Sequence, residues 1–448
     1  MRRIRRAGLT TKSDRPAVAI VGGGASGTIL AAQLARRDIS SVLIDGSGRV
    51  GKGVAYSTTE PAHLLNVRAE GMSALAGEPD HFARAFEADG GHRRGFAQRR
   101  FFGRYLGSLL GEAEASGKVK VMEATATQAS RTEGGWRLRL DDGSSIEADA
   151  LALATGNQEP DALRAFADAG DRFIRNPWGD VARHAIADLA GTGEAALIVG
   201  TGLTMVDLAL SLDAAGSTGR IVALSRRGLI PRTHADFDPA PVPLEDVPHG
   251  DVRSMTHWLR KRAAGVGWRA AVDSLRPHSH ALWQSFDTNQ QRRFLRHARP
   301  WWDVHRHRIA PEVGATVARM VANGQLEVVA GRIETATAID GGIEVTYRRR
   351  RGDQPTRETF AYAFNCTGPL HSVSHTRDPL LRSLLDSGEV RPDHLGIGLE
   401  IDGACRAAKH LWAMGPLTKG RYWEIIAVPD IREQAAQIAA DIEQELQQ

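Results

Sequence analysis

The chain of 448 residues has only two cysteines, Cys366 and Cys405, and they lie far apart in the sequence. No C-x-x-C pair occurs. Two distant cysteines cannot form a disulfide framework, and without a paired dithiol the chain is not expected to be a disulfide reductase. Sparse use of cysteine is typical of proteins in a reducing compartment, so a cytoplasmic location is expected.

Long apolar runs are also missing. No stretch approaches the roughly 18 consecutive apolar residues of a membrane-spanning helix. The basic start, Met1 to Arg6, is not followed by the apolar segment of a secretory signal. We therefore predict that residues 1–15 form a disordered basic arm and that the protein has no membrane partner.

The net charge is small, since 57 Lys and Arg stand against 53 Asp and Glu, and the basic residues are spread along the chain. This distribution lacks the basic stripe of a nucleic-acid-binding surface, and no nucleic-acid partner is expected. The small positive excess instead suits anionic cofactors and an anionic substrate. Nothing in the sequence indicates an oligomeric state.

Several common catalytic signatures are absent: G-x-S-x-G, H-E-x-x-H and the lysine loop of nucleotide triphosphatases. His305 and His307 would share a face only on a strand, and Asp303 is the one acidic residue near them. Arg306 and Arg308 would repel a cation, so no metal is expected. A bound organic cofactor would have to carry the chemistry.

A glycine loop, Gly22 to Gly27, follows the apolar run 17–21 and opens an alanine- and leucine-rich segment. This pattern predicts a strand, a dinucleotide-binding turn and a helix whose first N–H groups face a pyrophosphate. The next apolar run, 41–44, ends at Asp45, whose carboxylate would accept hydrogen bonds from an unphosphorylated ribose. A buried run closes later on Thr155 and Gly156. The predicted cofactor-binding residues of this first site are Gly22, Gly24, Ser26, Gly27, Asp45, Thr155 and Gly156.

A second glycine loop begins at Gly200, behind the apolar run 195–199, and Met205 stands where a third glycine is usual. The next apolar run ends in Ser225, Arg226 and Arg227, and arginines there favour a 2′-phosphate. The alternative is a solvated pair of charges. A later buried run closes on Thr367 and Gly368. The predicted residues of this second site are Gly200, Gly202, Thr204, Ser225, Arg226, Arg227 and Gly368.

The same order of elements therefore occurs twice. We predict an α/β fold with two Rossmann-type, three-layer dinucleotide-binding domains, each with an antiparallel β-meander insert. Residues 16–185 would form an FAD-binding domain that residues 370–448 complete. Residues 190–369 would form an NAD(P)-binding domain with a helical insertion at about 235–315.

The chain resembles a known family in five stretches: residues 53–57, 63–69, 200–207 and 302–308, and residues 415–424 with their Gly-Pro-Leu-Thr-Lys-Gly segment. On the basis of these stretches, it resembles bacterial FAD/NAD(P)-binding flavoproteins. The family's architecture is similar to that of flavin-containing and N-hydroxylating monooxygenases, and one activity it implies is FAD-dependent urate hydroxylation. The resemblance places Asn66 and Arg68 near the flavin ring and Gly415 against FAD. Pro416 stands where many two-domain flavoproteins have an acid.

We therefore expect an oxidoreductase with FAD and NADPH as cofactors, with NADH as the alternative to NADPH. The main hypothesis is a monooxygenase in which a flavin C4a-hydroperoxide, formed from molecular oxygen, hydroxylates a small polar, urate-like substrate. Arg68, His305 and Arg308 are the candidate catalytic residues. Two alternatives stay open: an NAD(P)H-dependent flavin reductase or dehydrogenase without oxygenation, and a non-catalytic nucleotide-binding protein.

Overall fold

The computed structural model describes residues 15–369 and 372–447. Most of the predicted N-terminal arm, residues 1–14, lies outside the described residues. Arg15 is held in place, because its Nε lies 3.0 Å from a carboxylate oxygen of Asp149 and its Nη2 donates to the carbonyl oxygen of Ala148. Arg15 thus lies at the edge of the first domain.

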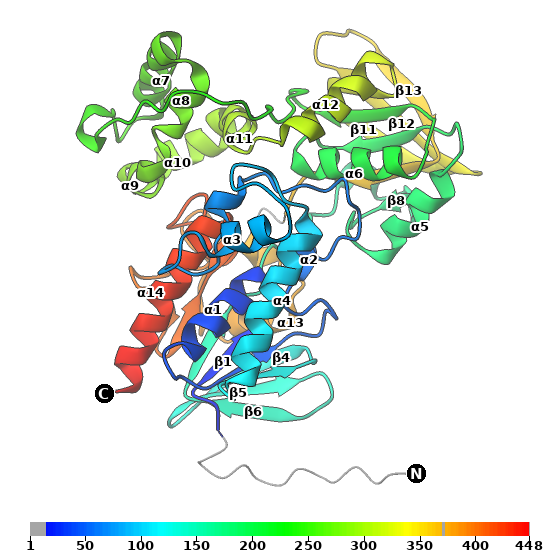
Figure 1. Ribbon diagram of the computed structural model, residues 1–448. Helices are drawn as coiled ribbons and strands as arrows, with labels where there is room; N and C mark the ends of the chain where they lie inside the picture. Colours follow the sequence, from blue (N-terminus) through cyan, green and yellow to red (C-terminus); the bar gives the residue numbers. More distant parts are fainter. Residues whose placement is uncertain (1–14, 370–371, 448) are drawn as a thin grey trace, which may run out of the picture.

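The first domain is built on a six-stranded sheet that takes strands from both ends of the chain (Figure 1). Its neighbours are parallel except for the last pair, β15 and β16, which is antiparallel. Because β16 pairs with β7, the C-terminal segment lies in the same sheet as the first glycine loop. The strand order is β15 (Arg406–Ala408), β16 (Leu411–Ala413), β7 (Ala150–Leu153), β1 (Val18–Val21), β2 (Ser41–Ile44) and β3 (Val119–Met122).

Different layers cover the two faces of this sheet. One face carries three helices, with α1 packed between the other two: α1 (Ala25–Ala35), α4 (Arg99–Ala115) and α14 (Val428–Leu446). The other face carries the predicted meander, β4 (Ala126–Thr132), β5 (Gly135–Leu140) and β6 (Ser145–Ala148), with α13 (Pro379–Asp386). In β5 the apolar residues alternate with Arg137 and Arg139, and only the apolar ones are buried.

The second domain has a seven-stranded sheet. Its order is β13 (Pro355–Phe360), β12 (Gly342–Arg349), β11 (Leu326–Ile339), β10 (Ile221–Ser225), β9 (Ala196–Val199), β14 (Tyr362–Asn365) and β8 (Phe173–Ile174). Helices α5 (Asp180–Leu189), α6 (Leu203–Ala214) and α12 (Pro311–Ala322) pack in one core with this sheet. The predicted fold class, two Rossmann-type domains, is confirmed.

One feature of the second meander differs from the expectation of a separate insert. Its first strand, β11, runs on from the parallel sheet, where it pairs with β10, into the antiparallel pairing with β12. The change of partner falls between Ala330 and Gly331, and a shift of register between Ile333 and Thr335 lies within the antiparallel pairing. The meander is therefore an extension of the main sheet.

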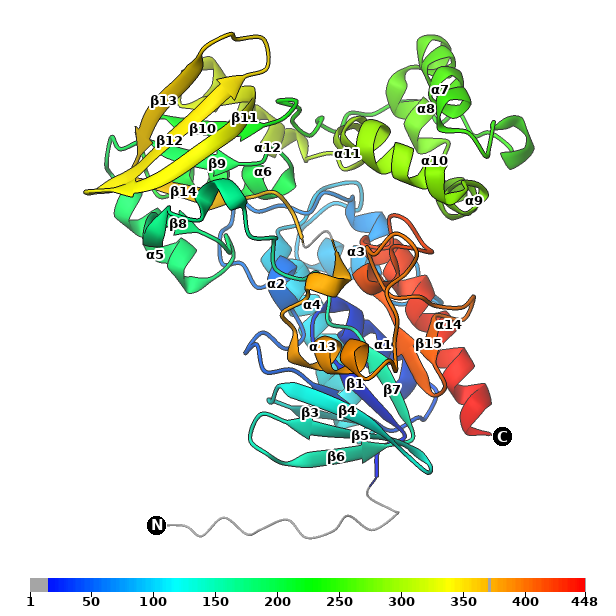
Figure 2. The ribbon, with the colours of Figure 1, turned by 180° about the vertical axis from the view of Figure 1, so that it is seen from behind.

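Between residues 235 and 315 the chain forms a helical layer beside the second domain and above the C-terminal helix (Figure 2). It reaches the first domain through Trp283, whose indole N–H donates to the carbonyl oxygen of Gly420 (2.8 Å) and whose ring stacks on Trp423. Glu424 is buried there with φ 70°, and its carboxylate accepts from Trp302 and Arg306. The helices are α7 (Val252–Val266), α8 (Trp268–Asp273), α9 (Ser279–Ser285), α10 (Thr288–Arg293) and α11 (Arg299–Arg306).

A second contact joins the two Rossmann-type domains directly. Arg99, the first residue of α4, forms an ion pair with Asp207 of α6, with Nη2 2.9 Å from Oδ1 and only 14% and 7% of the two side chains exposed. His63 of the first domain donates from Nε2 to the carbonyl oxygen of Asp207 (2.9 Å). This buried contact fixes α6 against the first domain.

Within residues 15–369 and 372–447, no helix is both long enough and apolar enough to cross a membrane.

The ion pair between the domains leads to a stability prediction. Asp207→Ala leaves the Arg99 guanidinium buried without its partner, and we expect the free energy of unfolding to fall by about 3 kcal/mol. Urea denaturation followed by circular dichroism measures the loss. The matched control is Glu78→Ala, which breaks the exposed pair with Arg36 and should cost less than about 1 kcal/mol. Equal losses in the two variants would show that the interdomain pair has no special role.

Candidate functional site

The first glycine loop brings α1 against β1 through contacts that only glycine permits. A Cβ on Gly27 would lie 1.9 Å from the carbonyl oxygen of Gly22, and a Cβ on Gly22 would lie 2.4 Å from that of Ala154. Gly22 also has φ 107°, a conformation that other residues rarely adopt. Gly24 is the N-cap of α1, without a side-chain cap. The first N–H groups of α1, including that of Ser26, therefore remain available for an anion.

Asp45 stands at the carboxyl end of β2, beside this loop. Its Oδ2 accepts from the backbone N–H of Gly23 (2.6 Å), and its Oδ1 accepts from that of Ser47 (2.7 Å). These bonds hold the carboxylate in place and leave lone pairs on both oxygens. The geometry fits the predicted contact with a ribose diol.

The order of the strands gives a direction to a dinucleotide in this site. Asp45 follows β2 and the loop follows β1, so the remaining half of a bound dinucleotide would extend toward the ends of β7 and β16. Thr155 and Gly156 follow β7, and Gly156 has φ 71° with open space around it. Gly415 follows β16, and its missing Cβ would lie 3.0 Å from Ser26 Oγ. The ends of β1, β2, β7 and β16 therefore form one cradle for a dinucleotide. This first cradle brings together all the residues predicted from the first glycine loop, and Gly415 with them.

The second site repeats this construction. Gly200 has φ 115°, and a Cβ there would lie 2.2 Å from the carbonyl oxygen of Cys366, which is two residues before Gly368. Gly202 is the N-cap of α6, with open space where its Cβ would be, and Thr204 is in the first turn. Met205, in the position of the usual third glycine, is fully buried in the core of this domain. The methionine is thus accommodated by packing, and the helix still begins beside the loop.

Ser225, at the end of β10, and the two arginines that follow it differ in what they contact. Ser225 Oγ already lies 2.9 Å from Thr201 Oγ1 and accepts from the backbone N–H of Gly228, so it stabilises the turn. Arg226 is exposed. The pKa of Arg227 is lowered by partial burial and by the positive charges of Arg226 and Arg350. Arg350, which follows β12, was missed from the sequence because only the pairing of β10 with β11, and of β11 with β12, brings it here.

Asn66 and Arg68 lie apart from the glycine loop, at the contact with the second domain. The carbonyl oxygen of Asn66 accepts from His234 Nε2 (3.0 Å), and Arg68 pairs with Asp236 (2.6 Å). Burial, followed by the charges of Arg308 and Arg68, lowers the pKa of His234 to about 4, so this imidazole is neutral at physiological pH. His234 was also missed from the sequence, since its neighbours come from another domain.

Arg308 is 3% exposed, pairs with Asp273 and faces the ring of Trp268. His305 packs edge-on against the same ring, and its Nδ1 lies 2.7 Å from the carbonyl oxygen of Trp301. His305 belongs to helix α11, so the strand geometry considered for it and His307 does not occur. Arg68, His305 and Arg308 thus lie around His234 and Trp268, where the helical layer joins the second domain.

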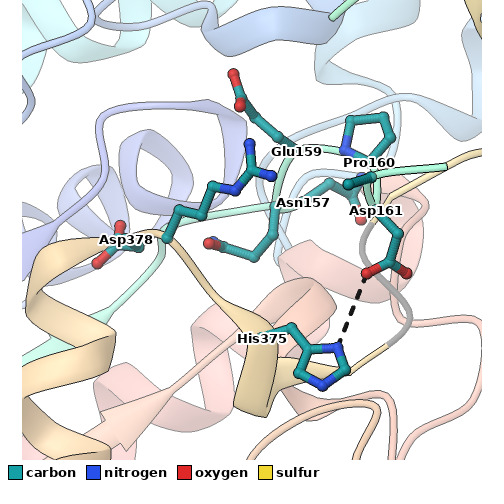
Figure 3. A pocket seen from close by; sticks show the side chains of 9 residues that line it. Asn157, Glu159, Pro160, Asp161, His375 and Asp378 are labelled. Atoms are coloured by element: carbon teal, nitrogen blue, oxygen red, sulfur yellow. Dashed lines mark ion pairs between the residues drawn. The ribbon is translucent and has the colours of Figure 1, made fainter. Parts of the chain in front are cut away.

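A cavity of about 570 Å³ lies where the chain crosses between the domains (Figure 3). The segment after β7 lines one side and the segment after β14 lines the other. His375 points toward Asp161, with Nδ1 4.0 Å from Oδ1. Burial raises the pKa of Asp378. The polar lining residues are Asn157, Gln158, Glu159, Asp161, His375, Arg377 and Asp378, and none of the three predicted catalytic residues is among them.

The fold and the two cradles define a class: two-domain dinucleotide-binding proteins of the FAD/NAD(P) type. Solved structures of this architecture cover nearly the whole chain. An ornithine hydroxylase from Pseudomonas aeruginosa has a TM-score of 0.63 at 15% identity, over 96% of this chain and 100% of that one. An L-lysine 6-monooxygenase from Pseudomonas syringae has a TM-score of 0.65 at 16% identity, over 96% and 99%. A thioredoxin reductase from T. acidophilum has a TM-score of 0.54 at 12% identity, over 97% and 99%.

Residues 19–158 match the model of the FAD-NAD(P)-binding family. The predicted resemblance is confirmed to that extent, and the cofactors are FAD and a nicotinamide dinucleotide. A comparison with curated protein sequences finds no match.

The close contact of Gly27 leads to a prediction about cofactor content. Gly27→Ala places a methyl group against the carbonyl oxygen of Gly22 and must push α1 away from β1, so we expect the purified protein to carry less than a tenth of the normal FAD. Absorbance at the flavin bands, relative to protein, measures this content. Gly111→Ala is the control, because Gly111 is exposed on α4 with open space around it. Normal FAD content in the Gly27 variant would contradict the role assigned to this contact.

Proposed function

We propose that the protein is an NADPH-dependent FAD monooxygenase acting on a small polar substrate, with FAD in the first domain and NADPH in the second. One observation carries the proposal: the segment that follows β7 in the first domain and the segment that follows β14 in the second lead to one cavity. In the first domain the sequence of contacts runs from Asp45 across the loop to Gly156. In the second it runs from the arginines after β10 across the loop to Gly368.

The segments that follow Gly156 and Gly368 then line the 570 Å³ cavity together. A nicotinamide and a flavin ring brought to this region could exchange a hydride, since positioning supplies much of the rate of such a step. FAD supplies the redox chemistry, and the chain supplies binding, orientation and exclusion of water. Asp161 and His375, together with Glu159, Arg377 and Asp378, offer donors and acceptors to a polar substrate.

The choice of a monooxygenase draws support from the similar structures, two of which are named as a hydroxylase and a monooxygenase of ornithine and lysine. Arg68, His305 and Arg308 lie outside the lining of the 570 Å³ cavity, and Arg68 and Arg308 are already paired with Asp236 and Asp273, so we assign them no direct contact with the substrate. The alternative is an NAD(P)H-dependent reductase or dehydrogenase without oxygenation, and it draws support from the similarity to thioredoxin reductase. The described chain offers this alternative no dithiol, because Cys366 and Cys405 are both buried and unpaired.

An oxygen-labelling experiment separates these two functions. We expect a screen of small polar molecules to find one that stimulates NADPH oxidation by the FAD-loaded protein with little release of peroxide. With that molecule and ¹⁸O₂, mass spectrometry should find one labelled oxygen atom in the product. Substrate-stimulated oxidation of NADPH that continues without oxygen would favour the reductase. A protein that cannot be reconstituted with FAD would leave only the non-catalytic function.

The preference for NADPH depends on the arginines at the second site. In Arg226→Ala/Arg227→Ala the 2′-phosphate loses its cationic partners, so we expect the KM for NADPH to rise at least tenfold while the KM for NADH changes less than twofold. Arg350→Ala should produce a smaller rise of the same kind. The control is Arg357→Ala, an exposed arginine of β13 paired with Glu344. Steady-state kinetics with both nucleotides tests this, and equal effects on the two would contradict the assignment.

A further inference from the structure

Lys419 lies between the ends of two strands of the first sheet. It directly follows the short 3₁₀ helix Gly415–Thr418, which comes after β16. Its Nζ donates to Oδ1 of Asn157, at 3.2 Å, and Asn157 comes after β7. The ammonium group therefore lies beside the ends of β7 and β16, where the flavin end of a dinucleotide in the first site would lie.

A small cavity opens at this point, and Lys419 is the one charged residue among the described residues that line it. The others are neutral: Gly156, Asn157, Gln158, Pro369, Val373, Ile397, Pro416 and Leu417. The described lining therefore offers no carboxylate that could neutralise the lysine. Two residues of this cavity, Asn157 and Gln158, also line the larger cavity between the domains.

We infer that the Lys419 ammonium faces the flavin ring in the first site and stabilises the negative charge that the ring gains on reduction. This inference rests on the proposed function, which places FAD in that site. A hydride from NADPH brings two electrons and one proton, so the reduced ring carries one more negative charge than the oxidised ring. An ammonium within the same poorly solvated region would offset that charge.

The electrostatic surroundings of Lys419 agree with this role. Burial, and next the positive charge of Arg299, lower the pKa of Lys419 to about 8, while Asp303 opposes the shift. Both Arg299 and Asp303 come from α11 of the helical layer. The lowered pKa means that neither solvent nor nearby negative charge fully balances the positive charge of this ammonium group in the cofactor-free protein. A nearby negative charge would raise this pKa again, by the same coupling through which the ammonium stabilises the charge.

The test is the midpoint potential of the bound flavin, measured against reference dyes at pH 7. In Lys419→Met we expect the equilibrium constant for two-electron reduction to fall at least tenfold, which makes the potential about 30 mV more negative. Lys419→Arg keeps the charge and should stay within threefold of the normal constant. Lys409→Met removes the same charge from an exposed position before β16 and should also stay within threefold.

The wild-type protein provides a second measurement that needs no variant. Because the pKa of Lys419 is about 8 without cofactor, we expect the oxidised protein to hold the amine neutral above this pH, and reduction should then take up two protons per two electrons, against one at lower pH. The potential should therefore fall twice as steeply with pH above this point, and Lys419→Met should lack the steeper part.

An unchanged potential in Lys419→Met, with FAD bound, would overturn the inference and leave the proposed function intact. A wild-type slope that stays constant through pH 8 would also overturn it. If the wild-type protein cannot bind FAD at all, the inference and the proposed function fail together.

Discussion

The buried ion pair between Arg99 and Asp207 is the constraint on which the relation of the two domains depends. Arg99 begins α4, which packs against α1, and the N-terminus of α1 is the first anion cradle. Asp207 lies in α6, whose N-terminus is the second cradle. The pair thus connects α6 with α4, the helix that packs against α1. Removing such a pair from water is costly, and His63 adds a hydrogen bond that helps to satisfy it.

The two cradles use one physical device. In each, a glycine with positive φ lets a helix start close to a neighbouring carbonyl group, so that unpaired N–H groups point at a phosphate. They differ in the charge at the end of the next strand, where Asp45 follows β2 and Arg226 and Arg227 follow β10. In the proposed function, these opposite charges on a common scaffold would let the protein distinguish two dinucleotides.

The helical layer adds a third component to this arrangement. Glu424, buried in the C-terminal segment of the first domain, accepts hydrogen bonds from Trp302 and Arg306 and so anchors the layer there. The same helix, α11, brings Arg299 and Asp303 near Lys419. The layer thereby influences the charge of Lys419 in the first domain.

Both glycine loops, the apolar strands beside them and the repeated order of elements could be predicted from the sequence, because these depend on local periodicity and on conformations that glycine alone adopts. The charges that follow β2 and β10 could be predicted in the same way. The packed fold was needed to bring Arg350 near Arg227, His234 near Arg68 and Arg308, and Lys419 to Asn157. These groups come from segments far apart in the chain, and no local pattern records which loops will converge once the sheets, the crossing segments and the helical layer have packed.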